Sequence, residues 1–386
     1  MNEGDICARS HATGGPVRLR WRDGVITSLE AVETEPPRDL WLVPPLLDLQ
    51  VNGFGGIDFQ QDQLTTDDLL RAVRSLRASA CTRFLLTLVT DEWPKLIGRL
   101  RHLRSLREAS DELREAMAGW HVEGPFLSAE PGFCGAHNPA WMCDPTPEHL
   151  RELREAAGDD PLLITLAPER LEAIAAVKLA VSLGMKVSLG HTDAPHKRIL
   201  QARMAGATGF THLGNGCPRE LNRHDNILWR MCETPGLLVS LIPDTFHVSP
   251  TLFRLLHRML GADSIYYISD AMAAAGAPPG RYKLGRLEVE VGEDRIVRFP
   301  GGTNFAGSAL EPIEGVFHAA RMLDCPWTEA WSRFSEAPAK LMGWPAGLAV
   351  GRPADFCLLE VIPENQPGDL SVYLRGKLRC GGDVPA

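Results

Sequence analysis

The sequence predicts a (β/α)8 TIM-type barrel joined to a small β-sandwich domain that is formed from both chain termini. Eight short apolar segments recur between residues 44 and 345, with helical segments between them, which is the pattern of a closed α/β barrel. Both chain ends are rich in strand patterns. No GxGxxG motif follows the first strand, which argues against a doubly wound open sheet. We expect residues 1–43 and 346–386 to form the sandwich and residues 44–345 the barrel.

Composition excludes several functional classes. The 386-residue chain has a formal net charge of −9, which argues against a general nucleic-acid binder. The first twenty residues contain no apolar run of signal-peptide length, and runs such as 84–89 are too short to span a membrane. The nine cysteines are scattered and never spaced CxxC, as in a reduced cytoplasmic protein. We therefore expect a cytoplasmic protein with neither nucleic-acid nor membrane partners.

The terminal segments predict β structure. Asp23-Gly24 separates the strand patterns 17–21 and 25–29, and an Asp-Gly pair in this position is a strong hairpin signal. Near the C-terminus, 354–359 and 371–374 have the same character. Neither end is long enough to form a core alone, so the two ends are expected to fold together.

The central block supplies the barrel strands, an inserted hairpin at 281–298 around Gly292, and two helices at about Glu311–Leu323 and Thr328–Phe334. The eight predicted strands are Leu46–Gln50, Phe84–Val89, Gly119–Val122, Leu162–Leu166, Lys186–Leu189, Gly209–Thr211, Leu237–Ile242 and Ser264–Ile268.

Polar residues stand at the carboxyl ends of several of these strands. Glu123 ends the third strand, while His191 and His212 end the fifth and sixth. Because chemistry in such barrels lies at the carboxyl ends of the strands, we expect these side chains to converge. A carboxylate and two imidazoles suit a hydrolytic divalent metal, with Zn favoured and Fe also suitable. Cys217 is a weaker candidate ligand, and His121 is interpreted as a supporting or core residue.

Asp270 ends the apolar run of the eighth strand. One interpretation is a helix cap for the residues that follow. The favoured one is a general acid–base group that takes a proton from a metal-activated water and returns it to a leaving amine. Such catalysis contributes roughly 10²–10⁴-fold in rate.

Eight segments resemble, in order, the conserved blocks of the N-acetylglucosamine-6-phosphate deacetylases of the amidohydrolase superfamily. They are HVEGPFLS, GAHNP, TLAPE, SLGHTDA, THLGNGCP, DTFHV, ISDAMAAAG and GTNFAGSAL, and the resemblance runs from about Pro44 to the C-terminus. It implies a barrel with a small β-sandwich, usually a homodimer. It also implies metal-dependent removal of the acetyl group from N-acetylglucosamine 6-phosphate.

The resemblance also implies residue roles. Glu123, His191 and His212 match the metal ligands, Asp270 the catalytic acid/base, and His137 the histidine that polarises the amide carbonyl. His247 matches a phosphate contact, and Arg223 falls where the family has a phosphate-binding arginine that often comes from the other subunit. The substrate-binding set is Ala136, His137, Asn215, Gly216, Arg223, His247, Phe305, Ala306 and Gly307.

Many amidohydrolases carry His-x-His on the first strand and bind two metals. This chain has Gln50-Val-Asn52, similar to the single-metal branch of the deacetylases. Amide side chains are poor zinc ligands beside imidazoles, so one metal is favoured over two.

The chain departs from the family pattern around the substrate. Leu221–Asn226 replaces a glycine-rich turn, Gly214, Gly216 and Cys217 replace bulkier residues, and the block at 268–276 lacks a frequent proline. These differences leave open an amidohydrolase of the same mechanism acting on a different N-acyl substrate, phosphorylated or not. A catalytically silent binding protein is disfavoured, because it would have lost a metal or proton-transfer position and none is lost.

Overall fold

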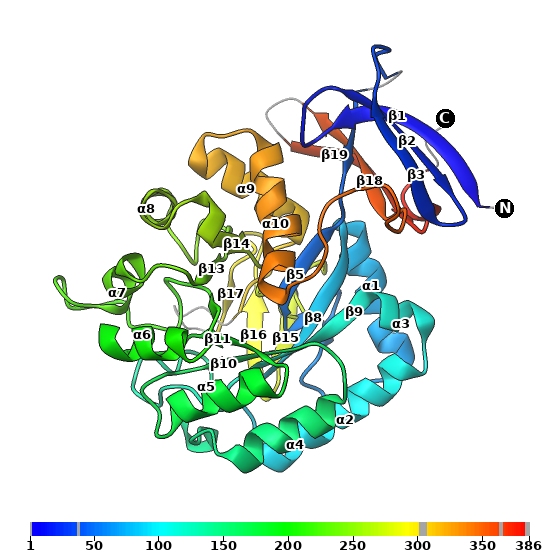
Figure 1. Cartoon of the computed structure of the whole chain (residues 1–386). Helices are drawn as coiled ribbons and strands as arrows, with labels where there is room; N and C mark the ends of the chain where they lie inside the picture. Colours follow the sequence, from blue (N-terminus) through cyan, green and yellow to red (C-terminus); the bar gives the residue numbers. More distant parts are fainter. Residues whose placement is uncertain (1, 37–38, 301–306, 363–365, 383–386) are drawn as a thin grey trace.

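The computed structural model of the protein describes residues 2–36, 39–300, 307–362 and 366–382. Within it, eight parallel strands follow one another around a barrel in chain order, and helices surround them (Figure 1). All eight predicted strands are confirmed with small changes in their bounds. They are β5 (Leu46–Val51), β8 (Cys81–Val89), β9 (Met117–Glu123), β10 (Leu162–Leu166), β11 (Lys186–Leu189), β12 (Gly209–Phe210), β13 (Leu238–Leu241) and β14 (Ile265–Tyr267).

The barrel closes between its first and last strands. The Asn52 N–H donates to the Ala271 carbonyl at 2.7 Å, and Val51 forms an isolated parallel bridge with Ala271. Deeper in the barrel, the Ser269 N–H donates to Asp48 Oδ2 at 3.0 Å. A side chain thus replaces part of the backbone ladder where β5 meets the chain after β14.

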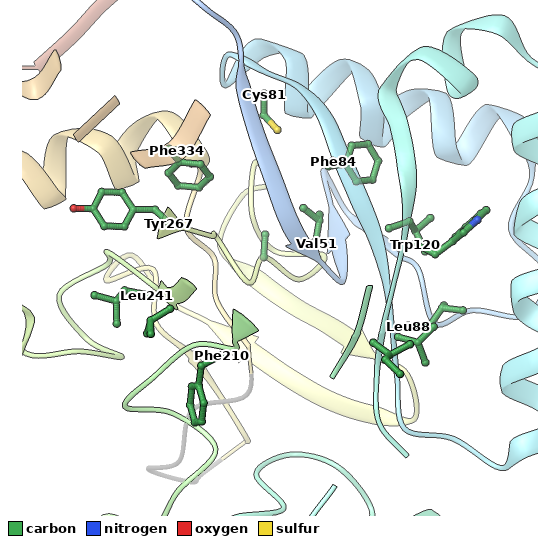
Figure 2. Packing of buried hydrophobic residues seen from close by; sticks show 14 of the residues in the cluster. Val51, Cys81, Phe84, Leu88, Trp120, Phe210, Leu241, Tyr267 and Phe334 are labelled. Carbon is green, nitrogen blue, oxygen red and sulfur yellow. The ribbon is translucent and has the colours of Figure 1, made fainter. Parts of the chain in front are cut away.

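The helices cover the outside of the barrel and bury their apolar faces against the strands. α10 is the clearest case: its Trp331 indole N–H donates to the Pro44 carbonyl at 2.9 Å, and Phe334 packs edge-on against Tyr267 of β14. Figure 2 shows this contact and, on the other side of the barrel, Phe84 and Trp120. The helices are α1 (Thr66–Ala78), α2 (Trp93–Glu108), α3 (Asp111–Ala116), α4 (Pro147–Ala157), α5 (Ala173–Ser182), α6 (His196–Met204), α7 (Ile227–Glu233), α8 (Pro250–Leu260), α9 (Pro312–Leu323) and α10 (Trp327–Met342), with 3-10 turns η1 (Pro139–Trp141) and η2 (Ala262–Ser264).

The last helix is longer than the sequence predicts. We expected it to end near Phe334, but α10 continues to Met342 through Pro338. Proline removes one backbone donor from a helix interior. Here Ala339, Leu341 and Met342 beyond it are buried, so packing of the last turn outweighs that loss.

Both chain termini contribute to a second, seven-stranded mixed sheet, as predicted (Figure 1). Trp21 of β2 packs on Phe356 of β18 with ring centroids 5.3 Å apart, although two strands separate them in the sheet. The sheet therefore curls over its own core, which fits the predicted β-sandwich. Its strands, in sheet order, are β20 (Lys377–Cys380), β19 (Gln366–Leu374), β18 (Phe356–Ile362), β4 (Leu40–Val43), β1 (Glu3–Ser10), β2 (Pro16–Arg22) and β3 (Val25–Ala31).

The Asp23-Gly24 hairpin is confirmed. Both residues have positive φ, 51° and 77°, as a type I′ turn requires. The predicted insertion at 281–298 is also a β structure, and it contains one more strand than a hairpin. Its strands are β15 (Gly280–Leu284), β16 (Leu287–Val291) and β17 (Val297–Arg298), and a small ribbon of β6 (Gly53–Phe54) and β7 (Ile57–Asp58) follows the first barrel strand.

None of the helices in the described part of the chain has the length and apolar character that a membrane span requires.

Candidate active site

A cavity of about 810 Å³ opens at the carboxyl ends of the barrel strands. Part of its wall comes from strand ends and their loops, and another part from the β15–β16 turn and the strand residues beside it, Leu284, Gly285, Arg286 and Leu287. Most of the predicted site residues line it: Glu123, Ala136, His137, His191, His212, Asn215, Gly216, His247, Asp270 and Gly307.

The three predicted metal ligands meet in this cavity. Ligand atoms of Glu123, His191 and His212 all lie within 4.8 Å of one another, and all three residues are buried. His212 Nε2 lies 2.8 Å from Glu123 Oε1, and His191 Nε2 lies 3.5 Å from the same oxygen. His191 Nδ1 lies 2.8 Å from the Phe133 carbonyl. That acceptor holds the proton on Nδ1 and leaves Nε2 free to ligate. The cluster fits a divalent cation.

The backbone turns these side chains inward at a conformational cost. His191, His212 and Asp270 have φ of 50°, 34° and 51°, in the left-handed region that non-glycine residues rarely occupy. Each such residue costs of order 1–3 kcal/mol, and strain of this kind concentrates at functional sites. The same strained conformation at three strand ends therefore supports the assignment of this cavity as a functional site.

Charges in the cluster depend on one another. Burial alone raises the pKa of Glu123, but hydrogen bonds from the surrounding histidines outweigh it and hold the pKa well below its usual value. Burial lowers the pKa of His191 to about 4. His212 is equally buried, but its contact with Glu123 raises its pKa above the usual value. Glu123 is thus an anion at neutral pH, as a metal ligand must be.

Asp270 lies in the same cavity, next to the cluster. Burial and the neighbouring negative charge of Glu123 raise the pKa of Asp270 to about 6. Opposing contributions come from His212, His247 and a hydrogen bond from Asn52 Nδ2 to Asp270 Oδ1 at 2.8 Å. A carboxyl group with a pKa near neutrality can both accept and return a proton.

The imidazole of His137 also lies beside the cluster. Its Nε2 lies 3.6 Å from Glu123 Oε2, and its ring centroid lies 4.6 Å from that of His191. Its Nδ1 lies 2.8 Å from Thr90 Oγ1. Sequence reasoning missed Thr90, although this residue directly follows β8 and obeys the same strand-end rule that found Glu123.

His247 and the loop of Asn215 and Gly216 complete the cavity. His247 Nδ1 lies 2.5 Å from Asp244 Oδ2, and this carboxylate raises the pKa of His247 despite its burial. Gly216 packs against His191: a Cβ there would lie 2.8 Å from His191 Nδ1. The bulkier residues of the related pattern would not fit at this backbone position without a shift.

The amides of the first strand contact carboxylates. Gln50 Nε2 donates to Glu123 Oε1 at 3.0 Å, and Asn52 Nδ2 donates to Asp270.

Cys217 is outside the cluster of possible ligands among the described residues, and burial raises its thiol pKa to about 11. His121 is buried, with Nε2 2.8 Å from Thr165 Oγ1, as a core or supporting residue would be.

One predicted residue, Arg223, is not brought to the site, and two others cannot be placed. Arg223 is exposed on the loop before α7 and is absent from the cavity wall of its own chain. Phe305 and Ala306 lie outside the described residues.

The cavity wall also holds charged residues that the sequence did not single out. Arg286 of the β15–β16 turn lies over the Trp141 ring, with its guanidinium carbon 4.4 Å from the ring centroid. It also donates to Asp91 Oδ1 at 3.3 Å. The turn is thereby tied to the loops that follow β8 and His137.

The chain has relatives of known sequence and of known structure. No model of a protein family matches the chain. It is 31% identical to N-acetylglucosamine-6-phosphate deacetylase of Danio rerio, over 83% of this chain and 80% of that protein. It is 30% identical to N-acetylgalactosamine-6-phosphate deacetylase of Shewanella sp. (strain ANA-3), over 87% and 82%.

The fold is similar to that of N-acetyl-D-glucosamine-6-phosphate deacetylase from Mycobacterium smegmatis, solved in complex with N-acetyl-D-glucosamine-6-phosphate. The TM-score is 0.87 at 28% identity, and the match covers 98% of this chain and 99% of that one. With this fold, this cluster and relatives of this identity along most of its length, the chain belongs to the N-acetylglucosamine-6-phosphate deacetylase family.

Proposed function

We propose that the protein hydrolyses the acetamide of an N-acetylated amino-sugar 6-phosphate, giving acetate and the free amine. N-acetylglucosamine 6-phosphate is the favoured substrate. The observation that carries the proposal is the common cavity of Glu123, His191 and His212, with Asp270 and His137 around them. The relative that acts on the galactosamine epimer makes that epimer the first competitor to test.

One divalent cation, most simply Zn, with Fe as the alternative, is proposed for Glu123, His191 and His212. When bound, such an ion polarises the amide carbonyl and lowers the pKa of water toward about 7. Gln50 and Asn52 turn N–H donors toward carboxylates, and amide side chains are poor zinc ligands beside imidazoles. Both points support one ion over two.

The chain's own residues then divide the work. Asp270 accepts the proton of the attacking water as the new C–O bond forms. It returns that proton to the nitrogen as the C–N bond breaks, so that a neutral amine leaves. His137, beside Glu123, donates to the carbonyl oxygen, where negative charge develops.

The remaining cavity residues are assigned to the sugar phosphate. Ala136, Asn215, Gly216 and Gly307 line the space beside the cluster, and Phe305 and Ala306 are proposed to extend this wall. Asn215 Nδ2 is buried without a hydrogen-bond partner in the described part of the chain, so it has a donor free for a hydroxyl group. His247, whose pKa Asp244 raises, supplies positive charge for the phosphate.

We propose a homodimer in which Arg223 reaches the cavity of the second copy. Arg223 is exposed and does not line its own cavity. The neighbouring helices α7 and α8 and the loop that precedes α8 (Figure 1) carry exposed apolar side chains that a partner subunit would cover. These side chains are Trp229, Phe246, Leu255 and Met259.

Cytoplasmic localisation remains part of the proposal. All nine cysteines are free in the structure, which supports a reducing compartment.

The decisive experiment compares turnover of N-acetylglucosamine 6-phosphate, N-acetylgalactosamine 6-phosphate and unphosphorylated N-acetylglucosamine, with metal content measured on the same preparation. We expect the glucosamine phosphate to give the highest kcat/KM and about one metal ion per chain. The Asp270→Asn variant serves as the inactive control. A preference for the unphosphorylated sugar would reject the phosphate assignment and favour another N-acyl substrate. Full turnover in metal-free protein would reject the mechanism.

A further inference from the structure

Thr90 makes two polar contacts with one atom of His137. Its hydroxyl oxygen lies 2.8 Å from His137 Nδ1, and its backbone N–H donates to the same nitrogen at 3.4 Å. Thr90 is buried, follows the last residue of β8, and lines the cavity. The other ring nitrogen, Nε2, faces Glu123 Oε2 at 3.6 Å.

These contacts determine where the imidazole carries its proton. A backbone N–H can only donate, so the nitrogen in front of it must accept. A hydroxyl can rotate to donate or accept, and its other nearby acceptor, the Glu123 carbonyl, is 3.5 Å away, at the long limit for a hydrogen bond. If Nδ1 carried a proton, that proton would point at the backbone N–H of Thr90. No two hydrogens meet when the hydroxyl and the backbone N–H of Thr90 both donate to an unprotonated Nδ1. The proton of the ring then lies on Nε2.

We infer that Thr90 is a positioning residue that holds His137 in its Nε2–H tautomer, with the N–H directed into the cavity. This inference rests on the proposed function, in which His137 donates to the carbonyl oxygen of the amide. In the opposite tautomer Nε2 would present a lone pair to an oxygen that gains negative charge. Thr90 touches no reacting atom and acts through His137.

Both segments that carry this contact are fixed by charged residues. Asp91, next to Thr90, accepts from the buried Arg99 at 2.9 Å and from Arg286. The Arg286 guanidinium also stacks on Trp141, four residues after His137. One residue of the β15–β16 turn therefore holds the Thr90 loop and the His137 loop together.

The Thr90 hydroxyl packs closely against the segment that carries Glu123. A Cβ added at Gly124, directly after Glu123, would lie 2.2 Å from Thr90 Oγ1. The Thr90 hydroxyl is thus packed between the Glu123 segment and the His137 ring.

The kinetic test compares Thr90→Val with Thr90→Ser in the zinc-loaded enzyme. Valine has the shape of threonine but no hydroxyl, while serine retains it. We expect Thr90→Val to lower kcat about tenfold, the effect of one lost neutral hydrogen bond, with KM unchanged, and Thr90→Ser to restore kcat. In a His137→Asn background, Thr90→Val should cause no further loss, because it acts only through His137.

The spectroscopic test needs no substrate. In zinc-loaded protein with ¹⁵N-labelled histidine, the ring whose signals disappear in His137→Asn should show an unprotonated Nδ1 and a protonated Nε2. A protonated Nδ1 in the wild type would overturn the inference. So would a Thr90→Val substitution that lowers kcat as much in the His137→Asn background as in the wild type. If no amino-sugar phosphate is hydrolysed while Nε2–H is observed, the proposed function fails and the tautomer assignment stands.

Discussion

Asn52 Nδ2 donates to Asp270 Oδ1 at 2.8 Å across the seam where the barrel closes. Two residues earlier on the same strand end, Gln50 Nε2 donates to Glu123 Oε1. The first strand therefore serves the two carboxylates of the site, one amide for each. A His-x-His pair at these positions would instead present lone pairs to a cation, so the amides change the role of this strand from ligation to orientation.

The Asn52 amide should control the pH dependence of the reaction. Its hydrogen bond stabilises ionised Asp270 and lowers the pKa of that carboxyl. Asp270 must be ionised to accept a proton, so kcat/KM should fall as pH falls through its pKa. Without a cation that pKa is about 6, and a bound cation lowers it, so the wild-type acidic limb should lie at or below about pH 6.

In Asn52→Ala the hydrogen bond is lost, the pKa of Asp270 rises, and the limb moves to higher pH. We expect a shift of about one pH unit, because one unit corresponds to ~1.4 kcal/mol, close to the lower end of what a hydrogen bond to a charged group contributes. Asn138→Ala is the matched control, since its side chain caps the Ala140 N–H at 3.0 Å instead. A limb that stays in place or moves to lower pH would refute the assigned role of Asn52.

Asp270→Asn should abolish proton transfer while preserving the fold. We expect kcat to fall roughly 10²–10⁴-fold, the usual contribution of a general acid–base group. Asp270 has φ of 51°, and asparagine is among the residues that tolerate this region best, so the melting temperature should change little. Metal content should match that of the wild type. Near-normal turnover in a variant that retains its metal would eliminate Asp270 as the proton carrier.

Glu123→Gln should separate metal binding from folding. One carboxylate oxygen of Glu123, Oε1, lies near both ligand imidazoles, 2.8 Å from His212 Nε2 and 3.5 Å from His191 Nε2. A neutral amide supplies no charge to a divalent cation, so the purified variant should contain much less metal than the wild type. A bound ion stabilises the folded state through mass action. A chelator should therefore lower the melting temperature of the wild type and leave that of Glu123→Gln unchanged. Equal metal content in the two proteins would show that the ion binds elsewhere.

Residues whose position follows from the barrel rule could be predicted from sequence. Glu123, His191, His212 and Asp270 each lie at the end of a barrel strand or within three residues of it, and strand ends in a parallel barrel share one face. Once the strands were identified, their convergence followed from topology. A role in substrate binding could be assigned to the loop of Gly214, Asn215 and Gly216 only through the resemblance, because a loop has no periodicity that fixes its path.

Other features depended on contacts that no local pattern encodes. Thr90 matters because of a distant histidine, and Arg286 because a turn folds back over Trp141. β1 (Glu3–Ser10) was not predicted, since its charged residues pair with β2 arginines and obscure the alternation. The roles assigned to individual site residues, and the boundaries between the two domains, stay predictions.

Asp48 offers a test of how the barrel closes. Its two carboxylate oxygens accept two different backbone N–H groups, Oδ1 from Gln50 at 3.1 Å and Oδ2 from Ser269 at 3.0 Å. An asparagine supplies only one oxygen and faces the second N–H with its own donors. We expect Asp48→Asn to lower the free energy of unfolding by ~1–3 kcal/mol, the cost of a buried unsatisfied group, in urea denaturation of the chelated protein.

The cost of Asp48→Asn should also depend on pH. Burial raises the pKa of Asp48 from 3.8 to about 7. Between these values the folded state retains a proton that the unfolded state has released, so this group's contribution to stability is largest below about pH 4 and is lost as pH rises toward 7. Asparagine does not titrate, so the difference in unfolding free energy between wild type and Asp48→Asn should be greater at pH 5 than at pH 7. A difference that grows with pH would mean that Asp48 is held as an anion. The hydrogen bonds from Gln50 and Ser269 would then outweigh the burial of the charge.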